Sequence, residues 1–246
     1  MAIYWHGIID STNNEAYRHI DSAQDFDVWA ASFQTAGRGQ KGNKWESKGG
    51  ENLTFTILLR PFKVKVEKQF LISQATSLGI TDYLQTNFLE ARIKWPNDIY
   101  VNDRKICGIL IEHYFNSVNL SVSIIGIGVN LNQEHFSADA PNPTSMSLES
   151  GIKRDPVIEL PLLLECIKPY FDSIYKDTRG KSSAAIEQKY IRKLYRLGEW
   201  HNYQECNSGK IFSAKITGVD NSACLVLEHE DGRSVRYAFK EIRYLS

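Results

Sequence analysis

The sequence of 246 residues has no excess of charge of either sign, because 29 Lys and Arg residues balance 29 Asp and Glu residues. Nothing in this balance indicates binding to nucleic acid, which basic proteins favour, or a disordered acidic tail. The longest apolar run, around residues 124–129, is far too short to cross a bilayer, and no Lys or Arg precedes the apolar residues of 1–10 as in a secretory signal. With 42% hydrophobic residues, the chain is predicted to be a globular cytoplasmic protein that contacts neither DNA nor membrane.

Several catalytic motifs are also missing. The four cysteines (Cys107, Cys166, Cys206 and Cys224) form no C-x-x-C pair, and the six histidines form no H-E-x-x-H pattern, so we expect reduced thiols and no protein-bound zinc. The sequence has no G-x-S-x-G, the usual signal for a serine nucleophile, and no G-x-x-x-x-G-K-[ST] of the P-loop. The chemistry therefore has to be sought in other patterns.

The hydrophobic pattern predicts the order of strands and helices. Strands are predicted at 3–9, 27–34, 53–60, 92–95, 99–101, 105–115 and 119–132, helices from 12 to about 21 and at 67–87, 155–176 and 182–197, and a loop at 133–147. Because strands and helices do not alternate strictly, we predict an α+β fold with a mixed, largely antiparallel sheet and flanking helices, and not a Rossmann sheet. After Gly198, short alternating runs at 210–217, 223–227 and 235–239 are typical of a small β-barrel. The change in hydrophobic pattern at Gly198 predicts two domains, a catalytic domain at 1–197 and a small C-terminal domain at 198–246.

A glycine-rich segment follows the second predicted strand. Residues 37–42 read G-R-G-Q-K-G and match the dinucleotide pattern G-x-G-x-x-G, but the residues after them, with Gly49 next to Gly50, cannot open the helix that this pattern needs. The segment is therefore predicted to be a long loop whose backbone N–H groups can bind an anion together with the cations Arg38, Lys41 and Lys44. A solvated surface loop is the alternative that this segment alone leaves open.

Charged and polar residues gather in two further places. K-W-P-N-D at 94–98 ends one predicted strand, and Lys105 enters an otherwise apolar strand three residues before Gly108, an arrangement that suits a fixed positive charge beside a ligand. A hairpin with a solvated turn explains the same residues without a ligand. Near the start of the chain, Thr12 and Glu15 predict a capping box that begins a helix, and a helix N-terminus is also an anion site.

Together these segments resemble the motifs of biotin protein ligases. The ordered set is S-T-N at 11–13, Q-T-A-G-R-G-Q at 34–40, W-x-S at 45–47, N-L at 52–53, K-W-P-N-D at 94–98, R-K-x-x-G-I-L at 104–110 and G-I-G-V-N at 126–130. The resemblance covers a class II synthetase-like catalytic core to about residue 180, and the β-rich tail is similar to the SH3-like domain that ends these enzymes. It implies that biotin and ATP, with Mg²⁺, give biotinyl-5′-AMP and pyrophosphate, after which biotin is transferred to a lysine of a biotin carboxyl carrier protein.

The resemblance also implies a role for each motif residue. Lys105 matches the catalytic lysine of the family, and Arg38 is expected to act with it on the charge that builds up on the phosphoryl oxygens. The biotin site is expected to consist of Ser11, Thr12, Asn13, Gln34, Arg38, Gly39, Gln40, Lys105 and Gly108. The nucleotide site is expected to consist of Trp45, Lys94, Asn97, Asp98 and Asn130. The metal ligands are left open.

The sequence departs from the family pattern G-R-G-R-x-G-R-x-W, because Gln40 and Asn43 stand in place of two arginines. Retention of the adenylate is therefore expected to depend more on Lys41 and Lys44, and the loop at 37–50 is expected to be mobile until biotin binds. Since ten residues precede Ser11, we expect no DNA-binding repressor domain. Two alternatives remain: a lipoyl or octanoyl ligase or transferase, whose R-R-x-x-G-G-G loop is missing, and a noncatalytic module that binds carrier domains. Whether the protein forms a homodimer is left open.

Overall fold

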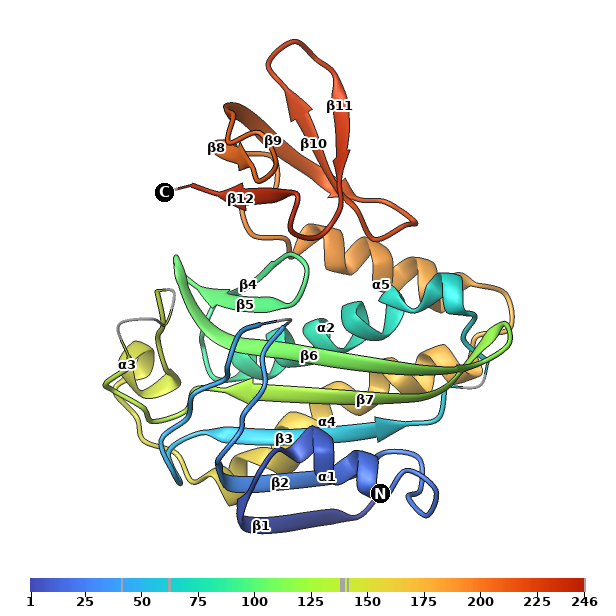
Figure 1. The fold of residues 1–246 in the computed structure, drawn as a ribbon, viewed down its shortest axis with the longest axis vertical. Helices are drawn as coiled ribbons and strands as arrows, with labels where there is room; N and C mark the ends of the chain where they lie inside the picture. Colours follow the sequence, from blue (N-terminus) through green and yellow to red (C-terminus); the bar gives the residue numbers. More distant parts are fainter. Residues whose placement is uncertain (41, 62, 138–139, 141, 246) are drawn as a thin grey trace.

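The computed structural model describes residues 1–40, 42–61, 63–137, 140 and 142–245. Its larger sheet has the strand order β1-β2-β3-β7-β6-β5-β4. The strands are β1 (Ile3–Ile9), β2 (Asp27–Gln34), β3 (Leu53–Leu59), β4 (Ala91–Lys94), β5 (Asp98–Val101), β6 (Arg104–Asn116) and β7 (Asn119–Val129). β1 pairs with β2 in parallel and the other pairs are antiparallel, so the predicted α+β fold with a mixed, largely antiparallel sheet is confirmed (Figure 1).

Helices lie on both faces of this sheet (Figure 1). α2 (Phe70–Thr86), which follows the short 3-10 helix η1 (Val66–Lys68), packs with α4 (Pro156–Lys176) and α5 (Lys181–Arg192) behind the sheet, whereas α1 (Thr12–Arg18) lies in front of it. α4 continues through Pro161 and Pro169, which weaken the sequence-based prediction of this helix. Its apolar stripe, which includes Leu160, Leu164 and Phe171, is buried, and this burial offsets the roughly 3 kcal/mol that a proline costs inside a helix.

Period-two alternation gives the larger sheet two different faces. On β3, Phe55 and Ile57 belong to the main core, whereas the hydroxyl of Thr56 contacts α1 on the opposite face. The register continues this division across β7 and β6: the first face is apolar, whereas the second holds small and polar residues beside a smaller apolar cluster that includes Leu58 and Ile124. Successive cross-strand rows on the second face are Thr54–Gly128–Gly108, Thr56–Gly126–Leu110 and Leu58–Ile124–Glu112.

The last fifty residues form a second, antiparallel sheet with the order β11-β10-β9-β8-β12. Its strands are β8 (Trp200–Glu205), β9 (Ile211–Val219), β10 (Leu225–His229), β11 (Ser234–Tyr237) and β12 (Ile242–Tyr244). In Figure 1 this sheet lies beyond α5 and the β4–β5 hairpin, and Trp95 joins the two parts by donating its Nε1–H to the Ala223 carbonyl at 3.0 Å. The division into domains of 1–197 and 198–246 stays a prediction.

Several element boundaries differ from the sequence-based predictions. α5 ends at Arg192 and not at 197, because the chain after it runs beside β4, where Ile93 N–H donates to the Lys193 carbonyl at 2.8 Å and Tyr195 N–H to the Ile93 carbonyl at 2.9 Å. The predicted loop at 133–147 ends in a short helix, α3 (Met146–Ser150), and its residues 138, 139 and 141 lie outside the described residues. β8 and β12 were not predicted, since both are partly polar and form through pairing, β12 with β8 and β8 also with β9. No helix in the described part of the chain is long and apolar enough to cross a membrane.

Candidate active site

One cleft brings together all of the residues predicted to bind biotin or nucleotide. It has a volume of about 1050 Å³ and is lined by the glycine-rich loop, the start of α1, the second face of the larger sheet and the edge of the C-terminal sheet. Among the predicted residues, Ser11 and Asn130 are 119 residues apart in the sequence and yet line the same cleft. The predicted residues in its lining are Ser11, Thr12, Asn13, Gln34, Arg38, Gly39, Gln40, Trp45, Lys94, Asn97, Asp98, Lys105, Gly108 and Asn130.

A network of neutral polar side chains lies at the α1 end of the cleft. Gln34 Oε1 accepts the Thr12 N–H at 2.8 Å and lies 3.2 Å from Thr12 Oγ1. Thr56, fully buried on β3, has its hydroxyl 2.8 Å from Thr12 Oγ1 and 2.6 Å from Asn13 Oδ1. These side chains offer neutral donors and acceptors without a charge, which suits a ligand with an amide-like head group.

The predicted capping box at the start of α1 is wrong. Ser11 is the N-cap residue and makes no side-chain cap hydrogen bond, while the side chain of Thr12 belongs to the polar network. The carboxylate of Glu15 accepts Arg18 Nη1–H at 2.6 Å and does not cap the helix. The side chains of Thr12 and Asn13 in the S-T-N segment are therefore fixed by hydrogen bonds within the polar network of the cleft and not by helix capping.

Glycines on β6 and β7 form the floor under the indole of Trp45. A Cβ atom at Gly128 would lie 2.2 Å from Trp45 Cε2, and one at Gly108 would lie 3.0 Å from Trp45 Cζ3. A Cβ at Gly126 would lie 2.2 Å from Asn13 Oδ1. No side chain larger than hydrogen fits under Trp45 or Asn13 as they stand, which is the physical reason for the G-I-G-V-N pattern. The Trp45 Nε1 is buried without a hydrogen-bond partner in the described structure.

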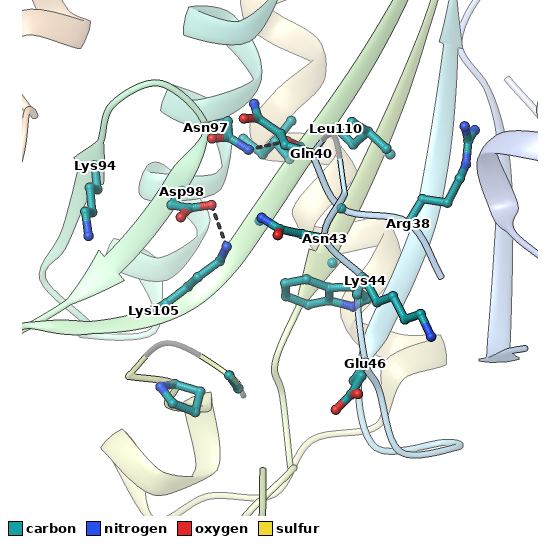
Figure 2. A pocket seen from close by; sticks show the side chains of 18 of the residues that line it. Arg38, Gln40, Asn43, Lys44, Glu46, Lys94, Asn97, Asp98, Lys105 and Leu110 are labelled. Atoms are coloured by element: carbon teal, nitrogen blue, oxygen red, sulfur yellow. Dashed lines mark hydrogen bonds and ion pairs between the residues drawn. The ribbon is translucent and has the colours of Figure 1, made fainter. Parts of the chain in front are cut away.

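Lys105 and Asp98 form an ion pair beside this floor. Figure 2 shows the ion pair, in which Lys105 Nζ lies 2.6 Å from Asp98 Oδ1. Lys105 Nζ also lies 5.8 Å from the centre of the Trp45 ring, and both charged side chains are about one-fifth exposed. The lysine extends from the start of β6 and the aspartate from the start of β5, next to it in the sheet. The ammonium is therefore held at one place in the cleft, open enough to meet an anion.

The other residues predicted for the nucleotide side have partners of their own. Lys94 Nζ donates to Tyr100 Oη at 2.9 Å and lies 5.0 Å from the centre of the Tyr244 ring, and burial lowers the pKa of this ammonium. Asn97 Nδ2–H donates to the Ile109 carbonyl at 2.8 Å. Asn130 Nδ2–H donates to the Thr144 carbonyl at 2.9 Å. These amides link strands and loops around the cleft, and their role toward a nucleotide stays a prediction.

The glycine-rich loop closes as a small hairpin over the cleft. Gly39 N–H donates to the Asn43 carbonyl at 2.9 Å and Trp45 N–H donates to the Gly37 carbonyl at 3.1 Å. The guanidinium of Arg38 binds Glu112 on β6, from Nη1 to Oε1 at 3.1 Å and from Nη2 to Oε2 at 2.7 Å. Figure 2 shows that it points away from Lys105. The predicted role of Lys41 falls on a residue outside the described ones, and mobility of this loop before biotin binds stays a prediction.

Sequence reasoning missed several parts of the site, among them Thr56, Glu112, the C-terminal sheet and lining residues such as Gln133 and Phe136 from the predicted loop at 133–147. Thr56 belongs to no recognised motif, but a polar residue within a fully buried strand needs a hydrogen-bond partner, and that need is a signal in the sequence. Glu112 stands on the same face of β6 as Gly108, four residues on, so period-two alternation offers a signal for it. The residues from the C-terminal sheet have no sequence signal, since more than 60 residues of helix and loop separate them from the nearest core strand. They are Cys206, Phe239, Lys240, Ile242, Arg243 and Tyr244.

Comparison with known proteins identifies the class to which this fold belongs. A biotin protein ligase from Aquifex aeolicus, solved in complex with biotin and ATP, superimposes with a TM-score of 0.80 over 99% of both chains at 24% sequence identity. The biotin protein ligase from Leishmania major, solved with biotinyl-5-AMP, has a TM-score of 0.64 over 96% of this chain and 98% of that one, at 22% identity. The fold is thus that of the biotin protein ligases.

Sequence comparison then identifies the family. Residues 6–130 match the model of the biotin/lipoate A/B protein ligase family. The biotin–[acetyl-CoA-carboxylase] ligase of Paracoccus denitrificans is 32% identical over 235 residues, which cover 92% of this chain and 94% of that protein. The bifunctional ligase/repressor BirA of Bacillus spizizenii is 29% identical over 237 residues, or 94% of this chain and 70% of that protein. The chain belongs to the biotin/lipoate A/B protein ligase family.

Proposed function

We propose that this protein is an ATP-dependent biotin protein ligase. It forms biotinyl-5′-AMP and pyrophosphate from biotin and ATP, and then transfers biotin to a lysine of a biotin carboxyl carrier protein. The observation that carries this proposal is the cleft itself, in which a glycine floor meets the buried polar network at Gly126 and a fixed ammonium, Lys105, near Gly108. The relative from Paracoccus that bears the ligase name covers nearly the full length of both chains.

The first step joins two anions, so it depends on position and charge. A carboxylate oxygen of biotin attacks the α-phosphorus of ATP, a C–O–P linkage forms, and pyrophosphate leaves. Lys105 can neutralise the approaching carboxylate and the phosphoryl oxygens, and because Asp98 already holds it in place, little reorganisation is needed. We predicted that Arg38 shares this task, but its guanidinium is bound by Glu112 in this structure.

The second step needs no covalent intermediate on the protein. The neutral amine of the carrier lysine attacks the acyl carbon of biotinyl-5′-AMP, an amide bond forms, AMP leaves with the electron pair of the broken C–O bond, and the nitrogen releases a proton to water. The carrier protein is proposed as the partner because the cleft is open to solvent and is lined both by the glycine-rich loop and by residues of the C-terminal part. A cytoplasmic location is part of the proposal, whereas a homodimer stays open.

Mg²⁺ is proposed to enter with the triphosphate of ATP. In such sites Mg²⁺ is held mainly by phosphate oxygens and water, together with one or two protein carboxylates. In the described lining of the cleft these carboxylates are Asp98 and Glu46. The described residues hold no group of three or more His, Cys, Asp or Glu that would form a metal site without the nucleotide. These two carboxylates fit Mg²⁺ that enters bound to ATP, where it would screen the charge on the leaving pyrophosphate.

The polar network favours biotin over the alternative substrates. Gln34, Thr12, Thr56 and Asn13 present several buried polar atoms at one end of the cleft. The ureido ring of biotin has both donors and an acceptor with which it can exchange hydrogen bonds with this network, whereas a dithiolane ring or an octanoyl chain cannot do so. A site with buried polar groups rejects a ligand that cannot pair them.

ATP–pyrophosphate exchange, measured separately with biotin, lipoate and octanoate, tests the proposed function. We expect exchange with biotin alone, followed by labelling of a purified biotin carboxyl carrier domain when all components are present. Exchange with lipoate or octanoate instead would establish the alternative acyl ligase. No exchange with any of the three acids by the folded protein would favour a noncatalytic carrier-binding module.

A further inference from the structure

We propose that Glu112 is a positioning residue of the biotin end of the cleft, which fixes the glycine-rich loop and the amide of Asn13 at the same time. The inference rests on the proposed function and deepens it. Glu112 lies outside the motifs that suggested that function, and its side chain acts through its neighbours. Its carboxylate is the point at which the loop, α1 and β6 meet.

Three donors converge on the carboxylate of Glu112. Arg38 occupies both oxygens with the two arms of its guanidinium, at 3.1 and 2.7 Å, and Asn13 Nδ2–H donates to Oε2 at 2.9 Å. All three partners are donors, so only the ionised carboxylate can accept from all of them. A forked arginine–carboxylate contact is shorter and more directional than a single-point ion pair. It is therefore suited to holding a loop in one place.

At the tip of the loop, residues 37–45, the side chain of Arg38 makes the hydrogen bonds that reach β6, whereas the second half of the loop is held separately, by Lys48 N–H to Gln133 Oε1 at 3.1 Å and by Gly50 N–H to the Ser32 carbonyl at 2.9 Å. The hairpin hydrogen bonds at the tip join residues 37, 39, 43 and 45 to one another. Arg38 reaches out of the hairpin to β6, 74 residues on in the sequence. With both arms on Glu112 and directed away from Lys105, the guanidinium contributes an anchor for the loop and not a second charge beside the ammonium (Figure 2).

The same carboxylate determines which way the amide of Asn13 faces. Asn13 donates to Glu112 through Nδ2 and accepts from the Thr56 hydroxyl through Oδ1, at 2.6 Å. An amide turned over would place its NH₂ group against Thr56 and its oxygen against Glu112. Glu112 thus sets the donor and acceptor pattern of the network that is proposed to meet the ureido ring.

Glu112→Gln tests this role, since glutamine keeps the shape but has one accepting oxygen in place of two. We expect the Kd of biotin, measured by titration calorimetry, and the rate of release of biotinyl-5′-AMP each to rise about tenfold. Arg38→Ala should raise the release rate as well. If Glu112 acts on the loop through Arg38, the double variant E112Q/R38A should release the adenylate no faster than E112Q. Additive effects, or wild-type binding of biotin by E112Q, would overturn the proposal.

Two further variants separate positioning from stability. Arg38→Lys leaves a positive charge on an exposed loop but cannot form a fork, and we expect faster release of the adenylate with an unchanged Tm. Wild-type release by R38K would count against the anchor.

Glu228→Gln is the matched control, because Glu228 pairs with Lys215 at 2.8 Å on the C-terminal sheet and its side chain is 33% exposed, against 32% for Glu112. It should bind biotin as the wild type does. Failure of the wild-type protein itself to bind biotin would refute the proposed function, whereas normal binding by E112Q would refute only the role of Glu112.

Discussion

Replacing Lys105 with methionine removes the ammonium from the cleft while keeping most of the aliphatic stem. This group lies 2.6 Å from Asp98 and is about one-fifth exposed, so it acts in a partly desolvated site where a fixed charge is worth more than in water. Loss of one preorganised group that stabilises developing charge typically lowers kcat by about 10²- to 10³-fold, or about 3–4 kcal/mol. We expect an effect of this size on ATP–pyrophosphate exchange with saturating biotin.

The same substitution should have little effect on folding. An ion pair with this exposure contributes about 1 kcal/mol or less, which corresponds to a fall in Tm of about 2–4 °C for a chain of this length. Lys215→Met is the control, because Lys215 also pairs with a carboxylate, at 2.8 Å, and lies 5.2 Å from the centre of a tryptophan ring. K215M should exchange at the wild-type rate. A folded K105M variant that exchanges at a normal rate would refute the assignment of Lys105 as the catalytic cation.

Three further substitutions probe the floor, the polar network and the pH dependence of stability. Gly128→Ala places a Cβ 2.2 Å from Trp45, so we expect displacement of the indole, seen as a shift in tryptophan fluorescence, and a loss of about 1–3 kcal/mol of stability; an unchanged spectrum would contradict this packing. Thr56→Val removes the hydroxyl 2.6 Å from Asn13, and calorimetry should show biotin binding weakened by about 1 kcal/mol or more; undiminished affinity would mean that the network does not contact biotin. Burial lowers the pKa of His113 from 6.5 to about 4, so the folded state resists protonation and stability falls as the pH drops below 6.5. Between pH 7 and 5 this group should cost about 2 kcal/mol of unfolding free energy in urea titrations, a loss that His113→Gln should not show; an equal loss in both proteins would exclude His113 as its source.

The fold of the core was largely predictable from its apolar runs, although β1, at the edge of the sheet, has no buried residue. β1 and β2 were predicted with the bounds that they have, and β3, buried along its whole length, differs by one residue. A strong apolar pattern of this kind predicts a strand even before its neighbouring strand in the sheet is known. β8 and β12 were missed because their sequences are partly polar, and they become strands through pairing, β12 with β8 and β8 also with β9.

Local sequence by itself determined which kinds of residue this protein brings to its site: glycines that admit close approach, a lysine at the mouth of an apolar strand, and neutral polar side chains before the first helix. The tertiary structure alone decided which of these residues contact one another through hydrogen bonds and ion pairs. The register of β3, β7 and β6 puts their glycines and Thr56 into adjoining rows, and it puts Glu112 within reach of Arg38 and Asn13. A motif records neighbours along the chain, whereas hydrogen bonds and ion pairs act over a few ångströms in space, so partners that lie far apart in sequence become visible only when the sheet is formed.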